Sequence, residues 1–249
     1  NTFSITGTVT SNTGTRLQGV TVSDASGQHL AVTDAAGKYS LTGLRVGTYR
    51  LTASKTGYVM APEYRDVALT GDTTGQDFTG YIEMSQSLPA GVNMIGVPGT
   101  PADTTPNDGL DASNPLAVFG NIPCFRYNPD ANPPAYVSAQ TNATAQIMQV
   151  KAGRGFFVKF NGPTTLRVAG TPTDTSKTYS IGLANGWNMI ANPMPGATPF
   201  ANFVPNSASS VRPFAFVYDN ASGSYLMVAA NAAIGVARTS LLPWEGAWV

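Results

Sequence analysis

The chain has 249 residues, too long for one small sandwich and suited to two or three modules that each bury a core. Only 11% of residues are charged, and 14 Lys and Arg residues balance 14 Asp and Glu residues. This neutrality, without cations clustered among aromatic residues, excludes a nucleic-acid partner and attraction to a charged membrane surface. No run of about 18 apolar residues occurs, so no membrane insertion is predicted.

The abundance of turn-forming residues indicates an all-β protein. The chain contains 26 Gly and 18 Pro among many Thr, Ser and Asn residues, which is typical of short strands joined by tight turns. The first residue is Asn1, not Met. We interpret this start as a chain exported through a removed signal peptide, with simple trimming as the alternative. The first interpretation predicts an extracellular or cell-surface location.

Residues 1–80 are predicted to form a β-sandwich of about seven strands. Apolar and polar residues alternate here with the period of two that half-buried strands show. Turn signals such as "NTG" (12–14) and "AAG" (35–37) separate the strands at short, regular spacing. The alternating apolar residues are Phe3, Ile5, Val9, Val20, Val22, Leu30, Val32, Tyr39, Leu41, Tyr49, Leu51, Val67 and Leu69.

The order of these motifs resembles a known domain. "GTVTSNTGTRLQGVTVSD" followed by "TDAAGKYSLTGLRVGTYRLTASKTGY" resembles the carboxypeptidase regulatory-like domains, transthyretin-like sandwiches related in shape to the Cna-B repeats of bacterial surface proteins. The resemblance covers residues 4 to about 79 and implies a spacer or adhesion module. Some related repeats bind calcium through clustered carboxylates, and Asp24 and Asp34 lie in turns. Turn-forming Asp residues need no metal, so no cofactor is predicted, with calcium as the alternative.

The remainder of the chain contains one unit twice. Matching residues of the two copies are 95 positions apart at the start of the unit and 91 positions apart further along. A single four-residue insertion in the loop around 99–115 of the first copy accounts for this change, because loops tolerate changes of length. The matching segments are "GVNMIGVP" (91–98) with "GWNMIANP" (186–193), "FRYN" (125–128) with "FVYD" (216–219), and "GRGFFV" (153–158) with "WEGAWV" (244–249).

We therefore predict three domains, at residues 1–80, 81–170 and 171–249, of which the last two are pseudo-symmetric, duplicated β-rich units. The duplicated region, residues 84–249, resembles the paired "GWNLIGNP" and "GxGYWV" segments of large secreted bacterial proteins. Val92 stands where Trp is usual, and Glu245 stands in place of a small residue. No activity attaches to such segments as a class, so the resemblance implies an extracellular setting only.

Residues suited to catalysis are scarce. His29 is the only histidine and lies in a predicted hairpin beside no nucleophile, which argues against a Ser-His-Asp triad and against a metal site built on His and Cys. Cys124 is the only cysteine and lies in the apolar run "IPCFRY", so we predict a buried and unreactive thiol. The sequence therefore predicts a protein that is not an enzyme.

Aromatic residues of the repeat provide a candidate binding surface, because the apolar face of a sugar stacks on exposed rings. Trp248 matches Phe157 in the first copy, which indicates core packing. Trp244 matches Gly153, so we expect it to face solvent. The residues selected as the candidate ligand or partner surface are Trp244, Tyr136 and Tyr225.

The favoured function is an extracellular structural protein, a building block of a cell-surface assembly, filament or stalk. Strand patterns at both chain ends, "FSITGTVT" and "EGAWV", could join neighbouring molecules by strand addition. The alternative is a carbohydrate-binding or adhesion module of a larger secreted protein. The expected partners are other copies of the chain, other surface proteins or polysaccharide.

Overall fold

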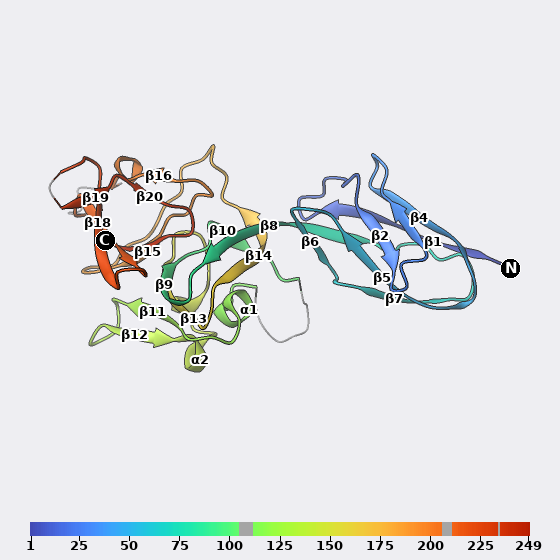
Figure 1. Ribbon diagram of the computed structural model, residues 1–249, viewed down its shortest axis with the longest axis horizontal. Coiled ribbons are helices and arrows are strands. Elements are labelled where there is room, and N and C mark those ends of the chain that lie inside the picture. The colour runs from blue at the N-terminus through green and yellow to red at the C-terminus, as the bar shows by residue number, and fades with distance from the viewer. Residues whose placement is uncertain (105–111, 206–210, 234) are drawn as a thin grey trace. The chain divides into compact units, whose positions relative to one another are not determined.

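The computed structural model describes residues 1–104, 112–205, 211–233 and 235–249. These residues form an all-β protein (Figure 1), as the composition predicts. They divide into two compact units, the first formed by Asn1–Glu83 with residues 103–104 and the second by Met84–Ala102 with the described residues from 112 onward. Within the described residues, no helix has the length and apolar character needed to cross a membrane.

The first unit is a sandwich of two sheets. One sheet has the order β4-β1-β8, with β6 also paired to β8, and the other has the order β3-β2-β5-β7. The first half of β8 thus adds to the seven strands that precede it, which are blue to teal in Figure 1. The strands are β1 (Phe3–Ser11), β2 (Thr21–Asp24), β3 (Leu30–Val32), β4 (Lys38–Leu44), β5 (Gly47–Ser54), β6 (Tyr58–Ala61), β7 (Arg65–Leu69) and β8 (Phe78–Leu88).

The core of this unit is built from inward-facing residues of both sheets, including Ile5, Val22 and Leu51. Leu30 and Val32 do not follow the predicted pattern, because they are 62% and 57% exposed. Strand β3 pairs with β2 so that Leu30 lies opposite Ser23 and Val32 lies opposite Thr21. Side chains of opposed residues share a face, so Leu30 and Val32 lie on the solvent face.

The second unit contains two larger sheets among its described residues, with the orders β12-β11-β13-β9 and β15-β21-β17-β18-β19. In addition, β8 pairs with β14, β14 with β10, and β16 with β20. The strands are β9 (Gly91–Ile95), β10 (Gly99–Pro101), β11 (Cys124–Asn128), β12 (Ala135–Ser138), β13 (Phe156–Phe160), β14 (Thr164–Pro172), β15 (Met189–Ala191), β16 (Thr198–Pro199), β17 (Phe214–Asp219), β18 (Ser224–Ala229), β19 (Val236–Arg238), β20 (Ser240–Leu241) and β21 (Gly246–Trp248). The helical segments are α1 (Pro115–Phe119), α2 (Ala139–Asn142), η1 (Gln146–Met148) and η2 (Phe200–Asn202).

The two larger sheets repeat one arrangement of strands. The order β9-β13-β11-β12 of the first copy returns as β15-β21-β17-β18 in the second. The registers agree as well, because Tyr127 pairs with Tyr136 as Tyr218 pairs with Tyr225. Order and register together confirm that the β-rich units are duplicated. The loop predicted to hold the insertion includes residues 105–111, which lie outside the described residues.

The repeated GxNMI segment fixes the turn before its strand. Gly91 and Gly186 have φ values of 93° and 85°, which a residue without a Cβ adopts readily. Two residues later, Asn93 Nδ2 donates to Gly91 O at 3.1 Å, and Asn188 Nδ2 donates to Gly186 O at 2.8 Å. Both asparagines are buried, and buried amides require such partners. The same residues recur because both copies need the same loop geometry.

The two copies also exchange equivalent backbone hydrogen bonds. Gly96 N donates to Trp244 O at 3.0 Å, and the matching Ala191 N donates to Gly153 O at 3.0 Å. Reciprocal contacts of this kind indicate a two-fold relationship, here a pseudo-two-fold axis within one chain. A Cβ on Gly96 would lie 2.3 Å from the Cβ of Ala191. Only one of these matched positions therefore has room for a methyl group.

Candidate binding surface

Trp244 does not face solvent. Its exposed fraction is 4%, and its φ of 64° is the one positive value of a non-glycine residue in the described chain. The matching Gly153 has a φ of 80°, so the two positions share a left-handed backbone and not an open surface. Trp244 lies in the same buried cluster as Ile95 and Val97 of the first copy. The expectation that Trp244 faces solvent is therefore wrong.

Tyr136 and Tyr225 lie at the exposed rim of a group of six rings, which we call the aromatic cluster. The two rim tyrosines are 52% and 48% exposed. Strands β11, β12 and β13 of the first copy supply three rings, and the matching β17, β18 and β21 supply the other three. The aromatic cluster consists of Tyr127, Tyr136, Phe157, Tyr218, Tyr225 and Trp248.

The inner rings of the aromatic cluster join the two copies. Tyr127 contacts Trp248 with ring centroids 5.2 Å apart, and the matching Tyr218 contacts Phe157 at 5.8 Å. Phe157 and Trp248 meet at 6.5 Å between centroids. These contacts are tilted or edge-to-face, the geometry that ring quadrupoles favour. The inner rings stabilise the pairing of the two sheets, which leaves the rim tyrosines as the more exposed groups.

The aromatic cluster contains no carboxylate, amine or guanidinium but carries hydroxyl groups that bond to no other described residue. Tyr225 Oη lies 3.4 Å from Trp248 Nε1, which donates to it. The hydroxyls of Tyr127, Tyr136 and Tyr218 have no hydrogen bond to another residue in the described part of the chain. Partial burial raises the pKa of Tyr136, as do the neighbouring phenols of Tyr225 and Tyr127. The surface thus combines apolar rings with neutral hydroxyls.

A partly buried cation, Arg126, lies where the two copies meet. Arg126 Nη1 donates to Gly155 O at 2.6 Å and to Met189 O at 2.9 Å. Its Nε is buried without a hydrogen-bond partner among the described residues. Burial, assisted by the charge of Arg154, lowers the pKa of Arg126 to about 10. Val217 occupies the matching position in the second copy, so this link between the copies is present once.

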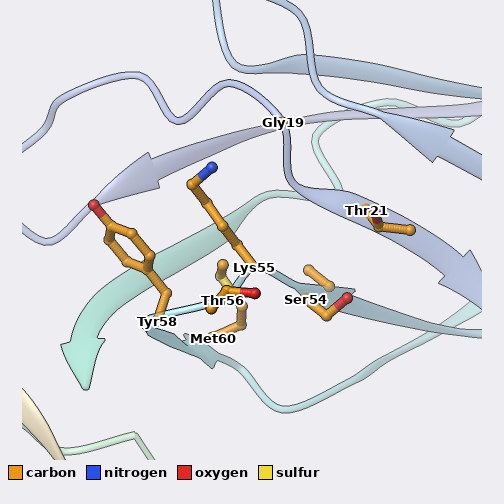
Figure 2. A pocket seen from close by; sticks show the side chains of 8 residues that line it. Gly19, Thr21, Ser54, Lys55, Thr56, Tyr58 and Met60 are labelled. Atoms are coloured by element: carbon orange, nitrogen blue, oxygen red, sulfur yellow. The ribbon is translucent and has the colours of Figure 1, made fainter. Parts of the chain in front are cut away.

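A pocket of about 480 Å³ lies in the first unit (Figure 2). The Lys55 side chain extends through it towards Gly19, and its Nζ donates to Gln18 O at 2.9 Å. Lys55 and Tyr58 are the ionisable residues of the lining, so the pocket lacks a matched acid and base for proton transfer. Its lining residues are Gly19, Thr21, Ala53, Ser54, Lys55, Thr56, Tyr58 and Met60.

The carboxylates considered for calcium binding, Asp24 and Asp34, accept hydrogen bonds within their own turns. Asp24 Oδ2 accepts from Ser26 Oγ at 2.7 Å and lies 3.1 Å from His29 Nδ1. Burial opposes ionisation of Asp24, but the hydrogen bonds from Ser26 and His29 outweigh it and lower its pKa to about 2. Asp34 Oδ1 accepts two backbone N–H groups of its turn. Among the described residues, no three His, Cys, Asp or Glu side chains form a group suited to a metal ion.

Cys124 is fully buried in the core of the first copy, as predicted. Burial raises the pKa of its thiol to about 12, so the nucleophilic thiolate is scarce at neutral pH.

The strands at the two chain ends are not free edges. Strand β1 lies between β4 and β8, and β21 lies between β15 and β17. Each strand thus has a neighbour on both sides, with β21 meeting β17 at Trp248 opposite Phe216, and this placement contradicts the prediction that these terminal strands join neighbouring molecules.

Comparisons with known proteins support one of the two resemblances. The family described as the carboxypeptidase regulatory-like domain matches residues 4–80. No curated protein matches the chain. The resemblance proposed for residues 84–249 stays a prediction, as do the three domain boundaries.

Solved structures show only distant similarity. A type II cohesin–X-dockerin complex from Acetivibrio cellulolyticus is 20% identical over 32% of this chain and 58% of that chain, with a TM-score of 0.27. This chain thus spans less than two thirds of that protein. The major pilin subunit of Bacillus cereus is 12% identical over 98% and 85% of the two chains (TM-score 0.30). A streptococcal ancillary pilin is 14% identical over 96% and 62% (TM-score 0.27). TM-scores this low give no indication of function.

Proposed function

We propose that the chain is a non-enzymatic structural or adhesion module that works outside the cell and holds a partner through the aromatic cluster. The observation that carries this proposal is the exposure of Tyr136 and Tyr225 at matching positions of the two copies. Exposed patches of large apolar groups mark interaction sites. Tyrosine is also among the residues that contribute most to recognition surfaces.

The organisation of the chain supports a role as a building block. A regulatory-like sandwich at residues 4–80 precedes a doubled β-unit. A stalk, filament or other surface assembly needs rigid modules with few reactive groups. In this proposal the protein reaches the cell exterior through a removed signal peptide, and it holds its partner through the aromatic cluster instead of through terminal strands.

The proposal is tested on intact cells of the source organism. Labelled wild-type protein should be retained by the cells, and the Tyr136→Ala/Tyr225→Ala double variant should be retained at least fivefold less. The matched control is Tyr64→Ala, which removes a tyrosine of the first unit that is 44% exposed. Protease added to intact cells should also degrade the endogenous protein. Equal retention of the double variant, or an endogenous protein that resists protease until lysis, contradicts the proposal.

A further inference from the structure

We infer that the aromatic cluster binds a neutral polysaccharide, with pyranose rings packed against Tyr136 and Tyr225. This inference rests on the proposed function and deepens it by naming the class of partner.

The first argument is the chemistry of the rim. Tyr136 and Tyr225 each expose about half of their surface, and the hydroxyls of Tyr127, Tyr136 and Tyr218 have no partner among the described residues. A purely apolar partner would bury these hydroxyls without hydrogen bonds, which is unfavourable. A pyranose has an apolar face for the rings and a rim of hydroxyls that donate to and accept from phenols. It satisfies both features of the surface.

The second argument is charge. The aromatic cluster contains no carboxylate, amine or guanidinium, and the carboxylate of Asp219, which follows Tyr218 in β17, accepts from Ser222 N and Ser222 Oγ at 3.0 and 2.5 Å. These hydrogen bonds lower the pKa of Asp219, so it is anionic. A polyanion would find no cation in the aromatic cluster with which to pair. The surface therefore favours an uncharged chain over an acidic glycan.

The third argument is the repetition of the surface. Trp248 contacts the Tyr136 ring at 6.4 Å between centroids and donates to Tyr225 Oη, so both rim tyrosines belong to one continuous patch. The same residue type is presented twice, once by each copy. A polymer of repeating sugars can contact both tyrosines at once, and linked contacts strengthen binding beyond either one alone.

Affinity electrophoresis of the full chain tests the inference. The gels contain hydroxyethyl cellulose, xyloglucan or yeast mannan as neutral probes, and polygalacturonate as the acidic probe. We expect at least one neutral probe to retard the wild-type protein, and we expect Tyr136→Ala/Tyr225→Ala to weaken that binding at least tenfold. Tyr136→Phe/Tyr225→Phe keeps the rings and loses the hydroxyls, so it should weaken binding by a smaller factor, roughly threefold. Thermal unfolding of each variant verifies that these rim changes leave the fold intact.

Trp187→Ala is the matched control, because Trp187 is 51% exposed and contacts Phe216 but no ring of the aromatic cluster. Its binding should equal that of the wild type. The inference is overturned when no neutral probe retards the wild type, when the alanine double variant binds as the wild type does, or when only polygalacturonate binds.

Sedimentation velocity separates failure of the inference from failure of the proposed function. Dimers that disappear in Tyr136→Ala/Tyr225→Ala, with no glycan binding, would identify a second copy as the partner. The inference would then fall while the proposed function stands. If the wild-type protein shows no cell retention, no glycan binding and no association through these tyrosines, both the inference and the proposed function fail.

Discussion

Replacing Gly96 with alanine tests the close contact between the two copies at the pseudo-two-fold axis. The added Cβ would lie 2.3 Å from the Cβ of Ala191 and 2.4 Å from Arg154 O. Carbon atoms pack best at about 3.5–4.0 Å, so the first contact is more than about 1 Å too short. Overpacking typically costs about 1–3 kcal/mol. Neither opposing atom can move by a side-chain rotation, so we expect about 3 kcal/mol, or a melting temperature lower by roughly 6–12 °C.

The assay is urea unfolding followed by circular dichroism, with calorimetry for the melting temperature. Gly182→Ala is the matched control, because its Cβ meets nothing within 4 Å and its φ is not positive. The control should change the free energy of unfolding by less than about 0.5 kcal/mol. Gly96→Ala combined with Ala191→Gly removes the contact between methyl groups and keeps the one with Arg154 O. This double variant should be more stable, by about 1 kcal/mol, than the two single effects predict when added. A Gly96→Ala protein as stable as the control, or strictly additive effects, would refute the proposed packing.

Three further outcomes follow from the buried groups. Asp24→Asn should lower the free energy of unfolding by about 2 kcal/mol at pH 7, because folding lowers the pKa of Asp24 from 3.8 to about 2. This contribution is complete above pH 4 and is lost as the pH falls towards 2, so a difference between wild type and variant that is independent of pH would count against it. Trp244→Ala should cost about 3–5 kcal/mol in urea unfolding. Trp244→Gly should cost about 1 kcal/mol less than Trp244→Ala, because glycine tolerates the positive φ, and the reverse order would show that the backbone is unstrained. Cys124 should react with a thiol reagent at pH 8 only after denaturation, and rapid labelling of the native protein would contradict its burial.

Sequence patterns predicted the features that local chemistry determines. Alternation marked Ile5, Val22 and Leu51 as inward-facing residues, and all three lie in the core. The matched segments predicted a duplicated unit, because both copies need the same glycine and asparagine to close the turn before the first strand. Alternation failed at Leu30 and Val32. A strand of three residues has no preferred face of its own, so the register with β2 determined which side chains were exposed.

Long-range contacts explain what the sequence could not predict about the candidate site. Tyr136 and Tyr225 are exposed, but nothing in the spacing indicates that Phe157 and Trp248 connect them, because that contact exists only when the two copies pair. Trp244 shows a different limit. Trp244 matches Gly153 in the sequence because both positions have a left-handed backbone conformation. That conformation does not determine whether a side chain points into the core or out of it.

The differences between the copies are informative because the two halves belong to one polypeptide. In an assembly of identical subunits each substitution appears on both sides of the axis, so alanine opposite glycine at positions 191 and 96 could not arise. A guanidinium at position 217 would place a charge in the core of the second copy, where Val217 is 1% exposed. Covalent fusion removes this constraint, because each half can mutate separately. One half can then supply a side chain at a contact between the copies that has space for only one.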